Sequence, residues 1–192
     1  MLYSNKAISE RRHMAEFLWI FWSFSLLGWG LERLFAAVTR SPQRRRRCLL
    51  LLPLCPVYGL GMAAVLALPP SLRSGWPLYL WGGLTATSVE YIYHWWGETF
   101  LSVSFWDYTG VFGNLRGRVC LPFSLAWGLL LFPAVYLVTP PVLALADRVP
   151  VGVTWWLLLA FTADAVCSLR FLAVTHDLEA LRAAVWPVPA KP

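Results

Sequence analysis

Charged side chains are scarce in this sequence. Only 14% of its 192 residues are Asp, Glu, Lys or Arg, whereas 58% are hydrophobic. A soluble domain has about 25% charged and about 45–50% apolar residues. Long uncharged runs recur along the chain, so a soluble domain explains the composition poorly. We expect an all-α integral membrane protein.

The sequence also lacks the motifs of several catalytic and metal-binding classes. It has no GxxxxGK[ST] phosphate loop, no HExxH motif, no CxxC spacing and no readable Ser–His–Asp set. ATP hydrolysis by a P-loop is therefore excluded for this chain, and we expect no metal and no cofactor. Whether the chain is an enzyme stays open. Four cysteines lie in or beside apolar runs, and we expect them to be small buried hydrophobes rather than disulfides: Cys48, Cys55, Cys120 and Cys167.

No cleavable signal is evident, because the first apolar run is too long and no A-x-A-like site follows it. A membrane-spanning helix needs about 20 residues. On this basis residues 1–192 form a single transmembrane domain with five helices, at about 17–38, 48–68, 77–98, 119–138 and 151–174. Residues 99–118 hold no spanning pattern, so we expect a polar loop or re-entrant segment between the third and fourth helices. Residues 139–150 are expected to form a turn.

Prolines interrupt the second and fourth of these segments. Pro53 and Pro56 fall in the first half of the second segment, where each removes a backbone hydrogen bond that lipid cannot replace. We expect this part to be irregular and buried against protein or a wet cavity. Pro133 is expected to kink the fourth helix.

The net charge of +6 comes mainly from short loops. We call side B the side of the membrane that the end of the first helix reaches, and side A the other. Five spans place the two termini on opposite sides. Side B then holds nine basic residues against five on side A: Arg40, Arg44 to Arg47, Arg116, Arg118, Arg182 and Lys191, against Lys6, Arg11, Arg12, Arg73 and Arg148. The positive-inside rule predicts a multi-pass protein of the bacterial inner membrane with its N-terminus outside and its C-terminus cytoplasmic. Orientation and anionic headgroups account for the basic residues, so we expect contact with membrane lipid and not with nucleic acid.

Alternating chain direction gathers the costly polar groups at side B. Helices one, three and five run toward side B, and charges such as Glu32 and Glu90 come late in them. A charge at mid-bilayer costs about 2.5–3.5 kcal/mol even on the mildest scale. We therefore predict a polar cavity open to side B. Its candidate residues are Glu32, Tyr58, Glu90, His94, Trp106, Asp107, Tyr108, Asn114, Arg116 and Arg118.

Simpler roles compete with this cavity. Long charged side chains such as Arg33 and Arg170 can reach the headgroups from within a helix. His94 is typical of a structural hydrogen-bonding residue, and Asp164 of a hydrogen bond between helices. Gly28 lies one turn before Glu32 and would let a neighbouring helix approach closely.

Four stretches resemble a known family: GWGLER (28–33), LPLCPVYGLG (52–61), the Glu90 helix with WDY (106–108), and NLRGRVCLPFSLAWG (114–128). They are similar to the CmpB-like family of type IV ABC-transporter permeases, over about residues 17–170. The resemblance implies a small membrane permease whose ATPase is a separate chain. Cys48 and Leu52 stand where the family pattern usually has Gly, and His94 does not belong to the pattern.

Three functions stay open. The first is a transport subunit that binds a small polar or lipid-headgroup ligand and works as a homodimer or with a separate ATPase or permease subunit. The second is an enzyme acting on a phospholipid, with Glu90 and Asp107 as base and acid and with Arg116 and Arg118 holding the phosphate. The third is a structural or assembly subunit whose polar cluster only holds helices together.

Overall fold

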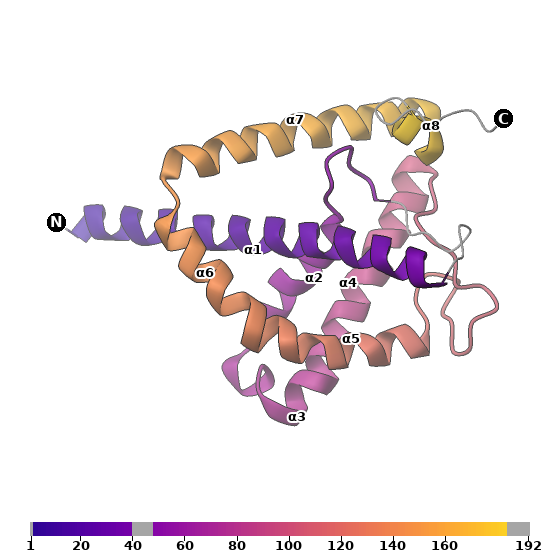
Figure 1. Ribbon diagram of the computed structural model, residues 1–192, viewed down its shortest axis with the longest axis horizontal. Coiled ribbons are helices and arrows are strands. Elements are labelled where there is room, and N and C mark those ends of the chain that lie inside the picture. Colours follow the sequence, from indigo (N-terminus) through magenta and orange to yellow (C-terminus); the bar gives the residue numbers. More distant parts are fainter. Residues whose placement is uncertain (1, 40–47, 184–192) are drawn as a thin grey trace.

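The computed structural model describes residues 2–39 and 48–183, with the side chains of residues 11–39 and 48–181. Figure 1 shows a bundle of helices without strands in this part of the chain. Four helices are separate and contain no π-helical turn: α1 (Leu2–Thr39), α2 (Pro56–Leu66), α7 (Val151–Thr175) and α8 (Leu178–Ala183). A short 3-10 turn, η2 (Pro70–Leu72), follows α2. Two longer helices contain π-helical turns: α3 (Gly75–Pro77), η3 (Leu78–Gly82), α4 (Gly83–Trp96) and η4 (Gly97–Leu101), then α5 (Leu121–Pro133), η5 (Ala134–Val138) and α6 (Thr139–Arg148).

Three helical stretches are long and apolar enough to cross a membrane: Arg11–Thr39, Leu121–Arg148 and Val151–Thr175. They confirm the all-α class. Five spans are not confirmed. The 11 residues of α2 rise only about 16 Å, whereas the hydrocarbon core is about 30 Å thick. The helix from Gly75 to Leu101 is continuous and long enough, but it is less apolar than the three helical stretches above and is not one of the candidate spans.

A continuous second helix over 48–68 is wrong, because residues 48–55 are not helical. The irregularity predicted from Pro53 and Pro56 is confirmed, and Pro56 becomes the first residue of α2. Asp164 of α7 accepts hydrogen bonds from the backbone N–H groups of Leu51 (3.1 Å) and Leu52 (3.0 Å). Protein therefore satisfies backbone groups that lipid would leave unpaired.

A turn over 139–150 is also wrong, because residues 139–148 form α6 and continue α5. Pro140 and Pro141 lie in the first turn of α6, where a missing N–H is tolerated. At Pro133, where the sequence predicts a kink, the helix passes into the π-helical turn η5, after which the Thr139 hydroxyl donates to the carbonyl oxygen of Ala134 (2.9 Å).

Helix α1 runs through the middle of the molecule, between α7 on one side and the α5–α6 helix on the other (Figure 1). Near the N-terminal end, α1 and α6 meet through an ion pair between Arg12 and Asp147 (2.9 Å). From there the α5–α6 helix leads away from α1, and α2 and α4 pack between α1 and α5. The close approach predicted at Gly28 is confirmed, because a Cβ there would overlap the ring of Tyr58 on α2.

The end of the bundle where α1 ends and α5 begins also holds the end of α7 and the loop from residue 102 to 120 (Figure 1). It corresponds to side B of the sequence analysis. The largest group of buried apolar residues lies toward this end, and it includes Cys48, Cys55 and Cys120. Burial is confirmed for these three cysteines but is wrong for Cys167, which is exposed; all four are free thiols.

Candidate functional site

A groove of about 640 Å³ lies between α1 and the α5–η5 segment, and we call it the α1–α5 groove. One wall is the face of α1 from Phe24 to Leu34, and the other is α5 and η5 from Trp127 to Val138. Its floor is formed by α2, from Val57 to Met62, and by Ala86 and Glu90 of α4. Almost all the lining atoms are apolar, so the groove differs from the polar cavity that the sequence predicted.

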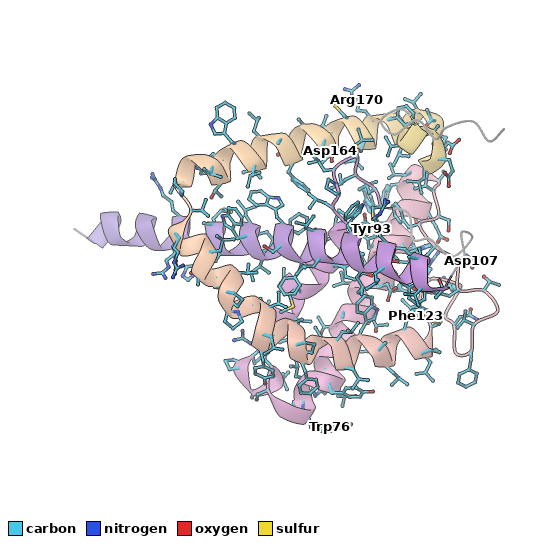
Figure 2. The ribbon with its side chains drawn as sticks, in the orientation of Figure 1. Trp76, Tyr93, Asp107, Phe123, Asp164 and Arg170 are labelled. Atoms are coloured by element: carbon cyan, nitrogen blue, oxygen red, sulfur yellow. The ribbon has the colours of Figure 1, made fainter. Side chains whose placement is uncertain are left out.

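The groove changes character along its length. Toward side A it is lined by apolar side chains such as Phe24, Met62 and Val138. Toward side B it reaches Trp29, Tyr58, Glu90 and Trp127, which all carry polar atoms. Past this polar part, the rings of Phe35 on α1 and Phe123 on α5 meet at 6.0 Å. Figure 2 labels Phe123 near the start of α5.

Glu90 is 2% exposed and accepts two side-chain hydrogen bonds. The indole Nε1–H of Trp127 donates to Oε2 (2.8 Å), and the hydroxyl of Tyr108 donates to Oε1 (3.3 Å). A buried carboxylate is tolerated only where such donors stabilise it. Glu90 thereby joins α4, α5 and the loop after η4.

Glu32 is connected to the same site through Tyr58. The hydroxyl of Tyr58 donates a hydrogen bond to Oε1 of Glu32. The ring of Tyr58 packs edge-on against the indole of Trp127 at 5.2 Å between centroids. Glu32, Tyr58, Trp127 and Glu90 therefore form one connected polar group along the side-B part of the groove.

A second polar cluster fastens the loop to α4. Arg118 donates from Nε to Glu98 (2.7 Å) and from a terminal nitrogen to the hydroxyl of Tyr91 (2.8 Å). Nε2 of the buried His94 lies 3.2 Å from Glu98 and 3.3 Å from the hydroxyl of Ser104. In a catalytic triad the carboxylate and the hydroxyl bind opposite ring nitrogens, whereas here both approach Nε2. This arrangement does not activate Ser104 as a nucleophile.

The loop of residues 102–120 holds the remaining predicted residues. Trp106 is buried, and its Nε1–H donates to the carbonyl oxygen of Arg118 (2.7 Å). Asp107 is exposed at the outer end of the molecule (Figure 2). Its pKa is lowered from the ordinary value of 3.8, because the side chain and then the backbone N–H of Thr109 hydrogen-bond to the carboxylate. Gly117 has a φ of +70°, and a Cβ there would crowd Asp107 and Thr109.

Asn114 and Arg116 are exposed in the same loop. The Asn114 side chain donates to the carbonyl oxygen of Val111 (3.0 Å) and accepts from the N–H of Gly117 (3.3 Å). Both bonds are local, so Asn114 shapes the loop. Arg116 takes a left-handed backbone conformation with a φ of +53°.

The structure thus brings Glu32, Tyr58, Glu90 and Tyr108 into one connected group and places His94 in the cluster of Arg118 and Glu98. Asp107, Asn114 and Arg116 lie on the exposed loop and make none of the contacts that define the groove. Among the residues with described side chains, no three His, Cys, Asp or Glu gather closely enough to hold a metal ion.

Sequence reasoning missed most of the groove. Its floor and walls include Gly30, Gly61 and Ala86, which leave open space, and Trp127, which holds Glu90. A signal was available for three of them, since Gly30, Gly61 and Trp127 all fall in the stretches that carry the family resemblance. No such signal singles out Ala86.

The fold and the apolar helices define the class: this is an all-helical membrane protein. The sequence model of the family described as "Putative ABC-transporter type IV" matches residues 19–169, which is most of the chain, and the chain belongs to that family. No curated protein and no solved structure gives a significant match.

Proposed function

We propose that this chain is the membrane subunit of a transport system and that it holds an amphipathic lipid in the α1–α5 groove. The observation that carries the proposal is the groove itself, which is lined almost entirely by apolar atoms and has its few polar side chains, Tyr58, Glu90 and Trp127, in the half toward side B. Its 640 Å³ falls within the range of about 300–1,000 Å³ that is usual for ligand sites. An amphipathic molecule with its head toward side B matches this gradient.

A small polar solute matches the groove less well. Such a ligand would leave hydrogen-bonding groups facing apolar walls, and each unpaired group costs about 1–3 kcal/mol on protein scales. The polar atoms of Glu90 already accept from Trp127 and Tyr108. A hydrocarbon tail would instead cover Phe24, Met62 and Val138 without leaving a polar group unpaired.

The transport system would need further chains. The sequence has no P-loop, so ATP hydrolysis would come from a separate ATPase subunit, and a homodimer or a partner permease would complete the pathway. The sequence predicts an excess of basic residues on side B, most of them at positions outside the described residues (40–47 and 184–192), and this excess favours a cytoplasmic side B.

The enzyme hypothesis has less support. A general acid must hold a proton at the working pH. The lowered pKa of Asp107 favours its ionised form, and its exposed position is outside the groove. The hydroxyl of Ser104 and the carboxylate of Glu98 share one nitrogen of His94, which does not favour nucleophilic catalysis either.

Two glycines allow the groove to be filled without disturbing the helices. A Cβ on Gly30 or on Gly61 would meet no other atom within 4 Å, and both residues line the groove. Gly152 on α7 is equally open but lies outside it. A leucine at either groove position should therefore occupy ligand space, and a leucine at Gly152 should not.

The test compares Gly30→Leu, Gly61→Leu and Gly152→Leu with the wild type by mass spectrometry of the lipid retained after extensive detergent washing. We expect the two groove variants to lose most of the retained lipid and Gly152→Leu to keep it. Equal lipid retention in all four proteins would contradict the proposal.

A further inference from the structure

We propose that the lipid in the α1–α5 groove carries a phosphate group and that Arg33 is the residue that binds it. This inference rests on the proposed function, because it assigns a chemical class to the same ligand. It starts from Arg33, whose guanidinium packs over the ring of Trp29, a residue that lines the groove.

Trp29 fixes the position of Arg33. The guanidinium carbon of Arg33 lies 5.0 Å from the centroid of the Trp29 ring, and Trp29 lines the groove. Residues four apart lie on the same face of a helix, so Arg33 follows Trp29 directly along α1. Leu34, the next residue, also lines the groove. The guanidinium therefore lies beside the groove near its side-B end, although Arg33 itself is not one of the lining residues.

The charge of Arg33 calls for an anion. The neighbouring carboxylate, Glu32, is hydrogen-bonded by Tyr58 of α2. Among the side chains that the structure describes, Arg33 has no ion pair; its contact is with the ring of Trp29. A cation so close to the hydrocarbon region is costly unless an anion stabilises it. The planar guanidinium matches a phosphate with two parallel hydrogen bonds, and a ring behind it leaves its outer edge available.

The order of these groups along α1 matches a phosphate-bearing lipid. The lining of the groove along α1 begins at Phe24 and ends at Leu34, and Arg33 lies beside the side-B end of this stretch. From Phe24 to Arg33 the helix rises about 14 Å. A hydrocarbon tail lying along this wall would bring its phosphate to the guanidinium. Diacyl phospholipids and polyprenyl phosphates share this chemistry.

A different explanation is that Arg33 only reaches the bulk headgroups of the leaflet. Arg170 provides the matched control for it. It is also an exposed arginine in a candidate membrane-spanning helix toward side B, but it lies on the outer side of α7 and does not line the groove (Figure 2). A groove-specific role predicts that only Arg33 affects lipid selectivity.

The experiment titrates purified full-length protein in detergent with two matched lipid pairs and follows the midpoint of thermal unfolding. One pair is dioleoyl phosphatidic acid and dioleoylglycerol, and the other is a polyprenyl phosphate and its polyprenol. Within a pair only the phosphate differs. For the wild type we expect one phosphate lipid to bind about tenfold more tightly than its partner. The pair that shows the preference identifies the source of the phosphate.

Arg33→Gln should remove this preference and leave the affinity for the uncharged partner unchanged. Arg170→Gln should keep the preference. Arg33→Lys retains the charge but cannot form two parallel hydrogen bonds, so it should keep part of the preference for the phosphate lipid. That result would show that the loss in Arg33→Gln is not a loss of folding.

A wild type that binds the phosphorylated and unphosphorylated lipids equally would overturn the inference and leave the proposed function standing. The same holds if Arg33→Gln and Arg170→Gln behave alike. Failure of the proposed function would look different, because neither lipid pair would then stabilise the wild type.

Discussion

At the scale of the residue, Glu90 is the most constrained polar group of the site. It is 2% exposed and receives an indole N–H and a hydroxyl from Trp127 and Tyr108. Both of its oxygens act as acceptors, which a carboxylate supplies and an amide does not.

Glu90→Gln should therefore destabilise the protein by about 1–3 kcal/mol. One carboxylate oxygen would be replaced by an amide NH₂, which is itself a donor and cannot accept from Trp127 or Tyr108. Thermal unfolding in detergent measures this change. Asp147→Asn is the matched control, since Asp147 is exposed in its pair with Arg12, and such a pair contributes about 0–1 kcal/mol. Equal effects of the two substitutions would show that the contacts of Glu90 contribute little.

Asp107 allows a prediction about pH. Its folded pKa lies below the ordinary 3.8 because of Thr109. A lowered pKa stabilises the fold above the unfolded pKa, and this contribution is lost as the pH falls through the folded pKa. The relevant window therefore lies below about pH 4.

Thr109→Ala removes the largest of these causes, so the pKa of Asp107 should rise toward its ordinary value, and Thr109→Ser should restore the lowered value. Titration of the Asp107 carboxyl carbon by NMR in micelles measures it. An unchanged pKa in Thr109→Ala would show that the backbone N–H alone is responsible.

Residue chemistry was only partly predictable from the sequence. The cost of a charge in lipid is enough to single out Glu32, Glu90 and Asp164 by their positions in apolar runs. It does not identify their partners. Trp127 and Tyr91 are ordinary aromatic residues of a membrane helix by sequence, and only the packing of α4 against α5 and the loop turns them into partners of Glu90 and Arg118.

At the scale of the element, two close contacts hold α2 in place. A Cβ on Gly28 would overlap Tyr58, and a Cβ on Gly59 would overlap the carbonyl oxygen of Phe21. Each glycine thus lets α1 and α2 approach closely, and the approach at Gly28 lets Tyr58 reach Glu32.

Gly28→Ala should force α1 and α2 apart and destabilise the protein by about 1–3 kcal/mol, as overpacking does. Gly30→Ala, two residues further along the same helix, meets no neighbouring atom and should be neutral or stabilising by up to about 1 kcal/mol. Thermal unfolding of the two variants measures the difference. If both behave like the wild type, α1 and α2 do not pack as described.

The irregular segment before α2 depends on α7. The two oxygens of Asp164 hold the N–H groups of Leu51 and Leu52, and the hydroxyl of Ser168 donates to Oδ1 (3.0 Å). Asp164→Asn would place an NH₂ group against a backbone donor. We expect faster hydrogen exchange at Leu51 and Leu52 in this variant. Thr162→Ala, on the exposed side of α7, should leave these amides unchanged.

Elements were predicted where a local rule decides them. Pro53 and Pro56 predicted the non-helical segment, because a proline inside a helix removes a backbone hydrogen bond. The same rule gave a wrong prediction at Pro140 and Pro141, where it predicted a turn and the structure has a helix. Two prolines are as acceptable in the first turn of a helix as in a loop. Only the continuation from α5 through η5 distinguishes these cases.

At the scale of the whole molecule, alternating chain direction predicted the gathering of polar groups at side B, and Figure 1 places the relevant helix ends and the loop there. The α1–α5 groove was not predictable in the same way. It exists because α2 and α4 fill only part of the space between α1 and the α5–η5 segment, and a gap between helices leaves no periodic pattern in a sequence.

The proposed function depends on a lipid that lies in this groove with its head toward side B. The most direct test is photo-crosslinking with a lipid that carries a diazirine in its acyl chain, followed by peptide mapping. We expect crosslinks concentrated on the groove faces of α1, α2 and α5, and their loss in Gly61→Leu. Crosslinks spread evenly over exposed apolar side chains, those of α7 such as Trp156 and Val166 included, would show that no lipid is held in the groove.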